Sequence, residues 1–196
     1  TDPADAAGVR RKTYITYDAS GRKTVERICG LGTTCGTNQE YRSETDYWGA
    51  TTLPSAVRQI DAVQGITLQT TFTYDLAGRL LTTDGPLPGS DDTAHFRYDV
   101  FGRKTWEIGP LGANGKRPAK KFTYRNSDDK VTAVEEGYVT LPTDTALTVV
   151  TRSDITYDAR RNPVRTAVSA SGTTWQVADA SYNDRGLPVC QAVRMN

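Results

Sequence analysis

Tyr98-Asp99-Val100-Phe101-Gly102-Arg103 is one of three close copies of the phrase Tyr-Asp-x-x-Gly-Arg in this chain of 196 residues. The other two copies are Tyr17-Asp18-Ala19-Ser20-Gly21-Arg22 and Tyr74-Asp75-Leu76-Ala77-Gly78-Arg79. A phrase that returns along a chain indicates a repeat architecture, in which each copy builds the same small unit. The phrase is therefore the part of the sequence that decides the fold.

Three weaker copies extend the series, and we call the first residue of each copy its marker tyrosine. From the second copy onward the marker tyrosines are 24, 26, 33 and 25 residues apart, whereas the first two are 57 apart, which predicts a further, degenerate copy within 40–65. The predicted structural repeat motif comprises Tyr17, Asp18, Gly21, Arg22, Tyr74, Asp75, Gly78, Arg79, Tyr98, Asp99, Gly102, Arg103, Tyr124, Tyr157, Asp158, Tyr182 and Gly186.

An alternating pattern of side chains precedes the marker tyrosines. In the second copy Phe72 and Tyr74 fall on one side and Thr73 on the other, and most other copies repeat this arrangement. A period of two in aromatic and β-branched residues is typical of a strand with one buried face. We expect the buried face to be the one that carries the marker tyrosines.

The phrase that follows each marker tyrosine suits a type I turn. An aspartate at the first position accepts hydrogen bonds from nearby backbone N–H groups, and a glycine takes a positive φ that other residues resist. A second strand comes next, so each unit is predicted to be a β-hairpin with a glycine bulge. Asp128 and Arg161 stand where the glycine is wanted. We expect a differently shaped turn at Arg161, with Asn162 in the special conformation.

Hairpins of this kind must associate, because an isolated two-stranded hairpin is only marginally stable in water. The sequence therefore predicts an all-β fold: an array of antiparallel β-hairpins that forms a continuous twisted sheet in a single domain over 1–196. The predicted units cover 13–39, 40–65 (the degenerate copy), 70–93, 94–119, 120–150, 153–178 and 179–196.

Composition excludes two classes of partner. The 24 basic and 23 acidic residues leave a net charge of +1, which gives no electrostatic footprint for nucleic acid. No apolar run approaches 18 residues, so we expect no membrane span.

The chain begins at Thr1-Asp2-Pro3 and ends directly after a repeat. We expect an excised piece of a longer chain, whose open strand edges could pair in an edge-to-edge dimer.

The sequence assembles no catalytic, cofactor or metal site, and we expect no enzyme activity. His95 is the only histidine, and the strand alternation places it outward beside Arg97. A Ser–His–Asp or Cys–His catalytic site would have to use this histidine. The sequence motifs that surround the nucleophile in such sites are not found in this chain. Turn capping explains the repeated aspartates, and the pairs Asp91-Asp92 and Asp128-Asp129 do not resemble a calcium-binding loop.

Three cysteines leave the redox state open. Cys29 and Cys35 flank a short loop that a disulfide could close, and two free thiols are the alternative. A metal site would need more ligands than this loop offers. Cys190 then remains without a partner.

Two further sets of residues have two interpretations each. The arginines of the phrase either pair with the aspartate of their own turn or bind a carboxylate or carbonyl of the neighbouring repeat. The tryptophans Trp48, Trp106 and Trp175 suit a β core, which we favour, and equally offer flat faces that stack on sugars.

The phrase, its spacing and the trailing breaks Gly85-Pro86-Leu87 and Gly109-Pro110-Leu111 resemble the YD-repeat proteins of the Rhs, toxin-complex and teneurin type, over about 13–192. The resemblance implies a hairpin array that, in full-length relatives, winds into a hollow shell around a toxic C-terminal domain or an unfolded polypeptide. The family's self-cleaving Asp-Pro-x-Gly segment has no match here, because Asp2-Pro3 is followed by Ala4-Asp5.

These observations lead to one hypothesis and one alternative. The hypothesis is a non-catalytic structural segment of a bacterial Rhs shell, secreted or at the cell surface, which encloses or presents a toxin or other C-terminal domain. Its partners would be the neighbouring repeats of the parent chain and an enclosed toxin domain. The alternative is a cell-surface adhesion module that binds carbohydrate through exposed aromatic residues.

Overall fold

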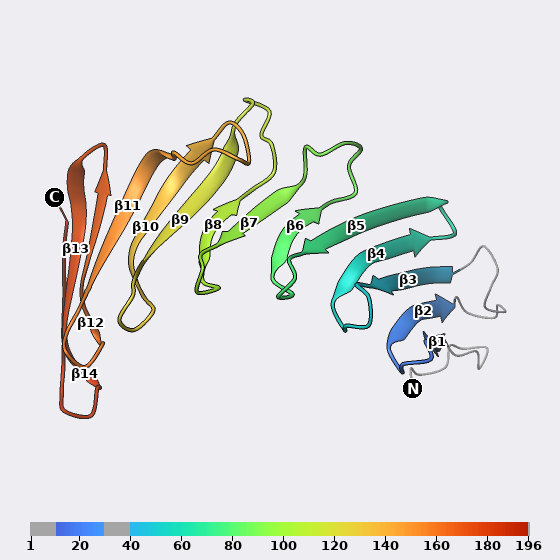
Figure 1. The fold of residues 1–196 in the computed structure, drawn as a ribbon, viewed down its shortest axis with the longest axis horizontal. Helices are drawn as coiled ribbons and strands as arrows, with labels where there is room; N and C mark the ends of the chain where they lie inside the picture. Colours follow the sequence, from blue (N-terminus) through green and yellow to red (C-terminus); the bar gives the residue numbers. More distant parts are fainter. Residues whose placement is uncertain (1–10, 30–39, 196) are drawn as a thin grey trace, which may run out of the picture. The chain divides into compact units, whose positions relative to one another are not determined.

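A computed structural model describes residues 11–29 and 40–195, which contain fourteen β-strands and no helix (Figure 1). None of these residues therefore belongs to a long apolar helix of the kind that crosses a membrane. The strands fall into two compact units, which divide between Asp92 and Thr93.

The first unit is a meander of six strands, in which each strand pairs antiparallel with the next along the chain. Its strands are β1 (Lys12–Tyr17), β2 (Lys23–Cys29), β3 (Glu40–Tyr47), β4 (Pro54–Asp61), β5 (Ile66–Tyr74) and β6 (Leu80–Asp84).

The second unit is a meander of eight strands with the same antiparallel pairing between successive strands. The predicted all-β class and the array of antiparallel hairpins are therefore confirmed. Its strands are β7 (Ala94–Tyr98), β8 (Lys104–Ile108), β9 (Arg117–Arg125), β10 (Lys130–Val139), β11 (Thr148–Tyr157), β12 (Pro163–Ala170), β13 (Thr173–Tyr182) and β14 (Pro188–Met195).

Every hairpin has a tyrosine at or next to the end of its first strand. In the hairpin of β3 and β4 this residue is Tyr47, which lies within the range of the degenerate copy. Trp48 follows it in place of the usual aspartate, so the phrase itself could not identify it. We include Tyr47 among the marker tyrosines from here on.

A β-bulge faces each marker tyrosine. Because the register shifts by one residue there, the second strand carries an extra residue, as Thr24 does between the partners of Thr16 and Tyr17. The Thr24 hydroxyl donates to the Thr16 carbonyl oxygen at 3.2 Å. Bulges bend a strand and increase its local twist, so each hairpin is bent at the same place. The extra residues are Thr24, Ser55, Leu81, Thr105, Thr132, Val164 and Val189.

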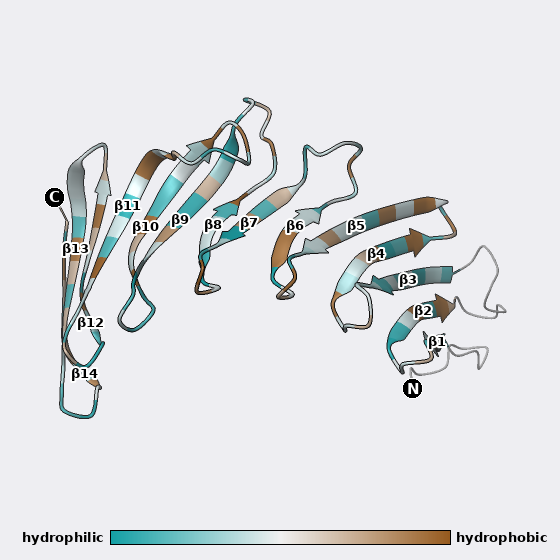
Figure 2. Cartoon of the chain, viewed as in Figure 1, coloured by the Kyte–Doolittle hydropathy of each residue, from teal (hydrophilic) through white to brown (hydrophobic). Residues whose placement is uncertain are grey.

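The buried face is the one opposite the marker tyrosines, so the expectation from alternation is wrong. Hydrophilic and hydrophobic residues do alternate along strands such as β4 and β5 (Figure 2). Long side chains on the opposite face form ion pairs there, as Arg58 does with Glu44 at 3.0 Å. The buried strand residues, all on this opposite face, are Cys29, Glu40, Ala56, Trp106, Ile108, Arg117, Ala119, Ala133, Val139 and Val177.

In the second unit a segment at 140–147 covers part of this face. Leu147 packs on the cluster of Trp106, Ile108, Ala119 and Val139. Ile108 pairs with His95, so this histidine lies on the same face as Arg97, as alternation predicted, and it is half-buried rather than fully exposed. Local alternation could not show this, because the covering segment lies about 50 residues further along the chain.

Arg97 on β7 holds the covering segment at 140–147 through hydrogen bonds to its backbone. Its Nη1 donates to the Asp144 carbonyl oxygen at 2.6 Å, and its Nη2 donates to the carbonyl oxygen of Pro142. The Asp144 carboxylate in turn accepts the N–H groups of Thr140 and Leu141, each at 2.9 Å. The segment is therefore an ordered part of the unit.

Candidate functional site: the clamp between neighbouring hairpins

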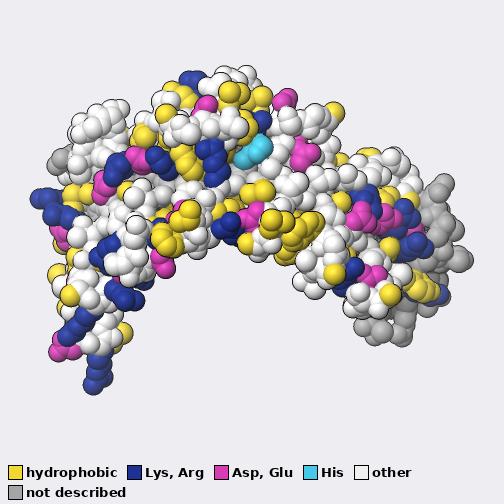
Figure 3. Space-filling view, viewed as in Figure 1, with side chains coloured by type: hydrophobic (Ala, Val, Ile, Leu, Met, Phe, Trp, Pro, Cys, Tyr) yellow, Lys and Arg dark blue, Asp and Glu magenta, His cyan; other side chains and the backbone are white. Residues whose placement is uncertain are grey.

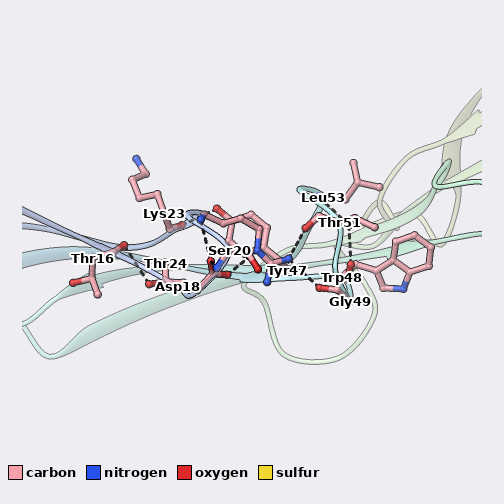
Figure 4. Close-up of polar contacts among 11 residues, drawn as sticks. Thr16, Asp18, Ser20, Lys23, Thr24, Tyr47, Trp48, Gly49, Thr51 and Leu53 are labelled. Atoms are coloured by element: carbon pink, nitrogen blue, oxygen red, sulfur yellow. Dashed lines mark hydrogen bonds and ion pairs between the residues drawn. The ribbon is translucent and has the colours of Figure 1, made fainter.

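The turn after each marker tyrosine is a frame of backbone and carboxylate hydrogen bonds. The Asp18 N–H donates to the Arg22 carbonyl at 2.9 Å, and the Gly21 N–H donates to the Asp18 carbonyl at 3.0 Å. Asp18 Oδ1 accepts the N–H groups of Ser20 at 2.8 Å and Arg22 at 2.9 Å (Figure 4). Gly21 has a φ of 76°, as the turn prediction requires.

The same carboxylate or amide bonds recur in four further turns, at Asp75, Asp99, Asp158 and Asn183. The Arg22 backbone N–H lowers the pKa of Asp18, and the Arg79 N–H does the same to the pKa of Asp75. The turn aspartates are therefore held as carboxylates, which is the form that accepts these bonds.

The turn at Arg161 has this same shape, so the expectation of a different turn is wrong. Arg161 itself takes the positive φ, at 70°, and its N–H donates to the Asp158 carbonyl at 3.1 Å. Asn162 completes the frame, because its Nδ2 and its N–H donate to the Asp158 carboxylate at 2.9 and 2.8 Å. The differently shaped turn occurs instead after Tyr124, where Asp129 has a φ of 59°.

Replacing Arg161 with glycine should stabilise the chain. A non-glycine residue at positive φ costs of order 1–3 kcal/mol, and the entropic cost of a glycine, about 0.5–1 kcal/mol, offsets only part of that. We expect Arg161→Gly to raise the free energy of unfolding in urea by about 0.5–1 kcal/mol. Arg185→Gly, at an exposed turn position without a positive φ, is the control and should bring no gain. A loss of stability at 161 would contradict the strain argument.

The arginine of the phrase links its own turn to the next hairpin. Arg22 Nε binds Asp18 Oδ2 at 2.7 Å, which is the pairing within the turn. Its Nη1 donates to the carbonyl oxygens of Gly49 at 2.9 Å and Thr51 at 2.6 Å, in the turn between β3 and β4. The guanidinium carbon lies 4.7 Å from the ring centroid of Tyr47. One side chain therefore performs both of the roles that the sequence left open.

Arg103 makes the equivalent link in the second unit. Its Nε binds Asp99 Oδ2 at 2.7 Å, and its two Nη atoms donate to Asp129 at 2.8 Å and Asn126 at 2.9 Å, in the turn of the next hairpin. Its guanidinium carbon lies 4.8 Å from the Tyr124 ring centroid. The arrangement thus occurs in both units with different acceptors.

In the hairpin of β9 and β10 the acid and the base exchange places. Arg125 follows the marker tyrosine, where the other turns have aspartate, and binds Asp128 through Nε at 2.8 Å and Nη2 at 2.6 Å. Its guanidinium carbon still lies 5.2 Å from the ring centroid of the next marker tyrosine, Tyr157. The ion pair and the stacking survive although the order of the residues does not.

The hydroxyl groups of five marker tyrosines reach back to the preceding hairpin. Tyr47 Oη donates to the Lys23 carbonyl, and Lys23 is the residue that pairs with the preceding marker, Tyr17 (Figure 4). Burial raises the pKa of Tyr74 and of Tyr124. The bonds are Tyr47 to Lys23 (2.7 Å), Tyr74 to Pro54 (2.9 Å), Tyr124 to Lys104 (2.7 Å), Tyr157 to Val131 (2.8 Å) and Tyr182 to Pro163 (3.1 Å).

All five acceptors obey one rule, since each is the strand partner of the preceding marker tyrosine. We call the forward contact of the arginine and the backward bond of the tyrosine, taken together, the clamp. Sequence reasoning assigned the tyrosines to the buried face and missed the hydroxyl bond. The available signal was the use of tyrosine, never phenylalanine, at every marker position.

Loss of the forward contact should weaken the clamp measurably. The Arg103 side chain is only 14% exposed, and Arg103→Met keeps its stem while removing the bonds to Asp99, Asp129 and Asn126. We expect a loss of about 1–2 kcal/mol in the free energy of unfolding by urea. Arg185→Met, on an exposed side chain, is the matched control and should stay within about 0.5 kcal/mol. If Arg103→Met and Arg185→Met lose the same free energy of unfolding, the forward contact of Arg103 does not stabilise the fold.

The Asp128 pair should make stability depend on pH in acid. Its hydrogen bonds from Arg125 hold the pKa of Asp128 at about 2, below the ordinary 3.8. A carboxylate with a depressed pKa stabilises the fold above its unfolded value, and this stabilisation is lost as pH falls through the folded value. We expect the loss between pH 3.8 and 2, measured by urea unfolding. Asp128→Asn should flatten the profile in that window, whereas Asp184→Asn, at a side chain 95% exposed, should leave it steep.

The remaining predicted positions offer little chemistry. Within 11–29 and 40–195, no cluster of three or more histidine, cysteine or acidic residues could hold a metal ion. Cys29 is buried and disulfide-bonded. Cys35 lies outside the described residues, so its pairing with Cys29 stays a prediction. Cys190 is an exposed free thiol.

The three tryptophans differ in burial. Trp106 is 7% exposed and belongs to the core of the second unit. Trp48 is half-buried, with its ring centroid 5.6 Å from that of Tyr74. Trp175 is 53% exposed, so the prediction that it belongs to the core is wrong.

Solved structures of toxin complexes share this fold. The chain matches the crystal structure of TcdB2-TccC3-Cdc42 over 90% of its length with a TM-score of 0.64 and 15% identity, and that of TcdB2-TccC3 over 85% with a TM-score of 0.60 and 15% identity. It matches the Photorhabdus luminescens Tc holotoxin pore, with a substitution in TccC3, over 92% at 0.50 and 12% identity. It spans only 9%, 8% and 11% of those chains.

No protein-family model matches the sequence, and no curated protein matches it. The structural matches nevertheless cover nearly the whole chain. The resemblance to YD-repeat shell proteins is therefore confirmed at the level of the fold.

Proposed function

We propose that this chain, which has the fold of toxin-complex chains, forms a stretch of wall in a bacterial YD-repeat shell and has no catalytic role. The clamp is the observation that carries the proposal. Sheet hydrogen bonds already join neighbouring strands, and the clamp adds side-chain bonds that tie the turn end of one hairpin to the next. A wall that encloses other molecules requires such joints, because it must resist separation of any two neighbouring hairpins.

Balanced charge on the strands also supports a wall that contacts water. Arg58 binds Glu44 at 3.0 Å and Asp46 at 2.7 Å in the first unit. Arg152 binds Glu135 at 2.7 Å and Asp154 at 2.8 Å in the second. Basic and acidic side chains lie close together over the visible face (Figure 3). Paired charges of this kind keep a thin sheet soluble without making it attract one sign of ligand.

In a longer parent chain, this wall would enclose or present a toxin or another C-terminal domain and would be secreted from the bacterial cell. The test uses the full-length natural protein that contains this sequence. Its digestion by proteinase K is compared in native buffer and after the protein has been unfolded. We expect further copies of the repeat phrase in the flanking sequence and a C-terminal domain that resists digestion only in native buffer. Equally fast digestion of that domain in both conditions would overturn the enclosure.

Adhesion to carbohydrate is the second candidate, and one observation favours it. Trp175 presents an indole that is 53% exposed, on a strand face rather than in a core. A glycan array with the 196-residue chain tests this candidate separately from enclosure, because neither measurement depends on the other.

A further inference from the structure

A hollow of about 560 Å³ lies on one face of β12, β13 and β14. Ala167 and Val177 pair across its floor, and Val177 pairs with Arg194 on the other side. Short floor side chains stand between the longer Arg165, Trp175 and Arg194, which explains why the face is concave there. The volume falls in the range of pockets that bind small molecules.

A β-bulge places the tryptophan at this hollow. Gln176 pairs with Val168 and Thr174 pairs with Ser169, so Trp175 is the extra residue of β13. A bulge re-aims a side chain that regular pairing would direct elsewhere, and bulges are frequent beside functional sites. The strand pairing itself therefore positions the exposed indole of Trp175 next to the buried floor of the hollow.

The charge of the hollow is positive. Two of its lining side chains are arginines and none is acidic. Arg165 is partly neutralised, since its Nε lies 3.2 Å from Asp179 Oδ1. Arg194 forms no ion pair with any residue in the described part of the chain. A ligand with a single negative charge would complement this arrangement.

We propose that the hollow binds one uronic acid unit of an anionic glycan. The indole of Trp175 would stack on the apolar C–H face of the sugar ring, and the guanidinium of Arg194 would bind the carboxylate through two parallel hydrogen bonds. Thr174 and Gln176 line the same hollow and supply hydroxyl and amide groups for the sugar hydroxyls. A flexible acidic peptide offers no flat face for the indole, so the sugar fits better.

The test is calorimetric titration of the 196-residue chain with trigalacturonic acid at physiological salt, where weak surface attraction is screened. We expect saturable binding that maltotriose, a neutral trisaccharide, does not show. Trp175→Ala and Arg194→Gln should each weaken binding by about tenfold or more. Arg185→Gln, at an exposed turn arginine outside the hollow, should bind like the unmodified chain.

Three results would overturn this proposal: absence of trigalacturonate binding, unchanged binding by Trp175→Ala, or equally tight binding of a triglutamate peptide. A urea unfolding curve of each variant keeps the outcome interpretable. Because Trp175 and Arg194 lie outside the core cluster, both variants should unfold as the unmodified chain does. The proposal rests on the carbohydrate candidate above and not on enclosure of a toxin, which the proteinase K digestion tests separately.

Discussion

Trp106→Ala should lower the free energy of unfolding of the second unit by about 3–5 kcal/mol, the range for truncation of a buried aromatic residue. Trp106 is 7% exposed. Two cations also stack on it, with the Arg97 guanidinium carbon 5.1 Å and the Lys121 Nζ 5.4 Å from its ring. The covering segment at 140–147 packs on the same cluster, so its contact should loosen as well.

Urea unfolding followed by far-ultraviolet circular dichroism measures this loss, and hydrogen exchange of 140–147 reports the covering segment. Trp175→Ala is the matched control, because it removes the same side chain from a site that is 53% exposed. We expect the control to cost less than about 1 kcal/mol. If the two variants lose equal stability, Trp106 is not the centre of the core.

Gly137→Ala is expected to cost about 3 kcal/mol, at the upper end for overpacking a tight site. A Cβ at this position would overlap the carbonyl oxygen of Thr148 and lie 2.9 Å from its carbonyl carbon. These atoms belong to the backbone of β11, so no side-chain rotation relieves the overlap. Gly137 also lies at a register shift between β10 and β11. The pairing of these two strands must therefore separate locally.

Gly115→Ala is the control for the general cost of replacing a glycine. Gly115 has a φ of 72° and open space where the Cβ would stand, so only backbone strain of about 1–2 kcal/mol applies. Urea unfolding of the two variants should rank Gly137→Ala below Gly115→Ala. The reverse order would mean that β11 moves aside at little cost.

Features that depend on neighbours in sequence could be predicted. Asp18 and Gly21 lie within one turn, and their roles follow from the local bonding of aspartate and the conformational freedom of glycine. Arg161 shows the limit of local reasoning. Its intrinsic preference opposes a positive φ, but bonds from Asn162 to Asp158 hold the frame in which it sits.

Features that depend on distant residues could not be predicted. Tyr47 donates to a carbonyl 24 residues earlier, and Arg22 reaches a carbonyl 29 residues later. Backbone carbonyls are present at every residue, so the sequence does not show which one is the acceptor. The position of Trp175 depends on a register shift between β12 and β13, which alternation cannot reveal.

The clamp also bears on how such an array could lengthen. Arg22 and Arg103 reach the hairpin after their own, and five marker tyrosines donate to the hairpin before theirs. The hydroxyl needs only a backbone carbonyl, as at Lys23 and Pro54. The hairpin of β9 and β10 shows both halves of the joint, because Tyr124 bonds to Lys104 before it and Arg125 stacks on Tyr157 after it. Tandem duplication of its coding segment would give copies that fit one another at once, and later drift could alter the polar partners, as at Arg125 and Asp128, without opening the seam.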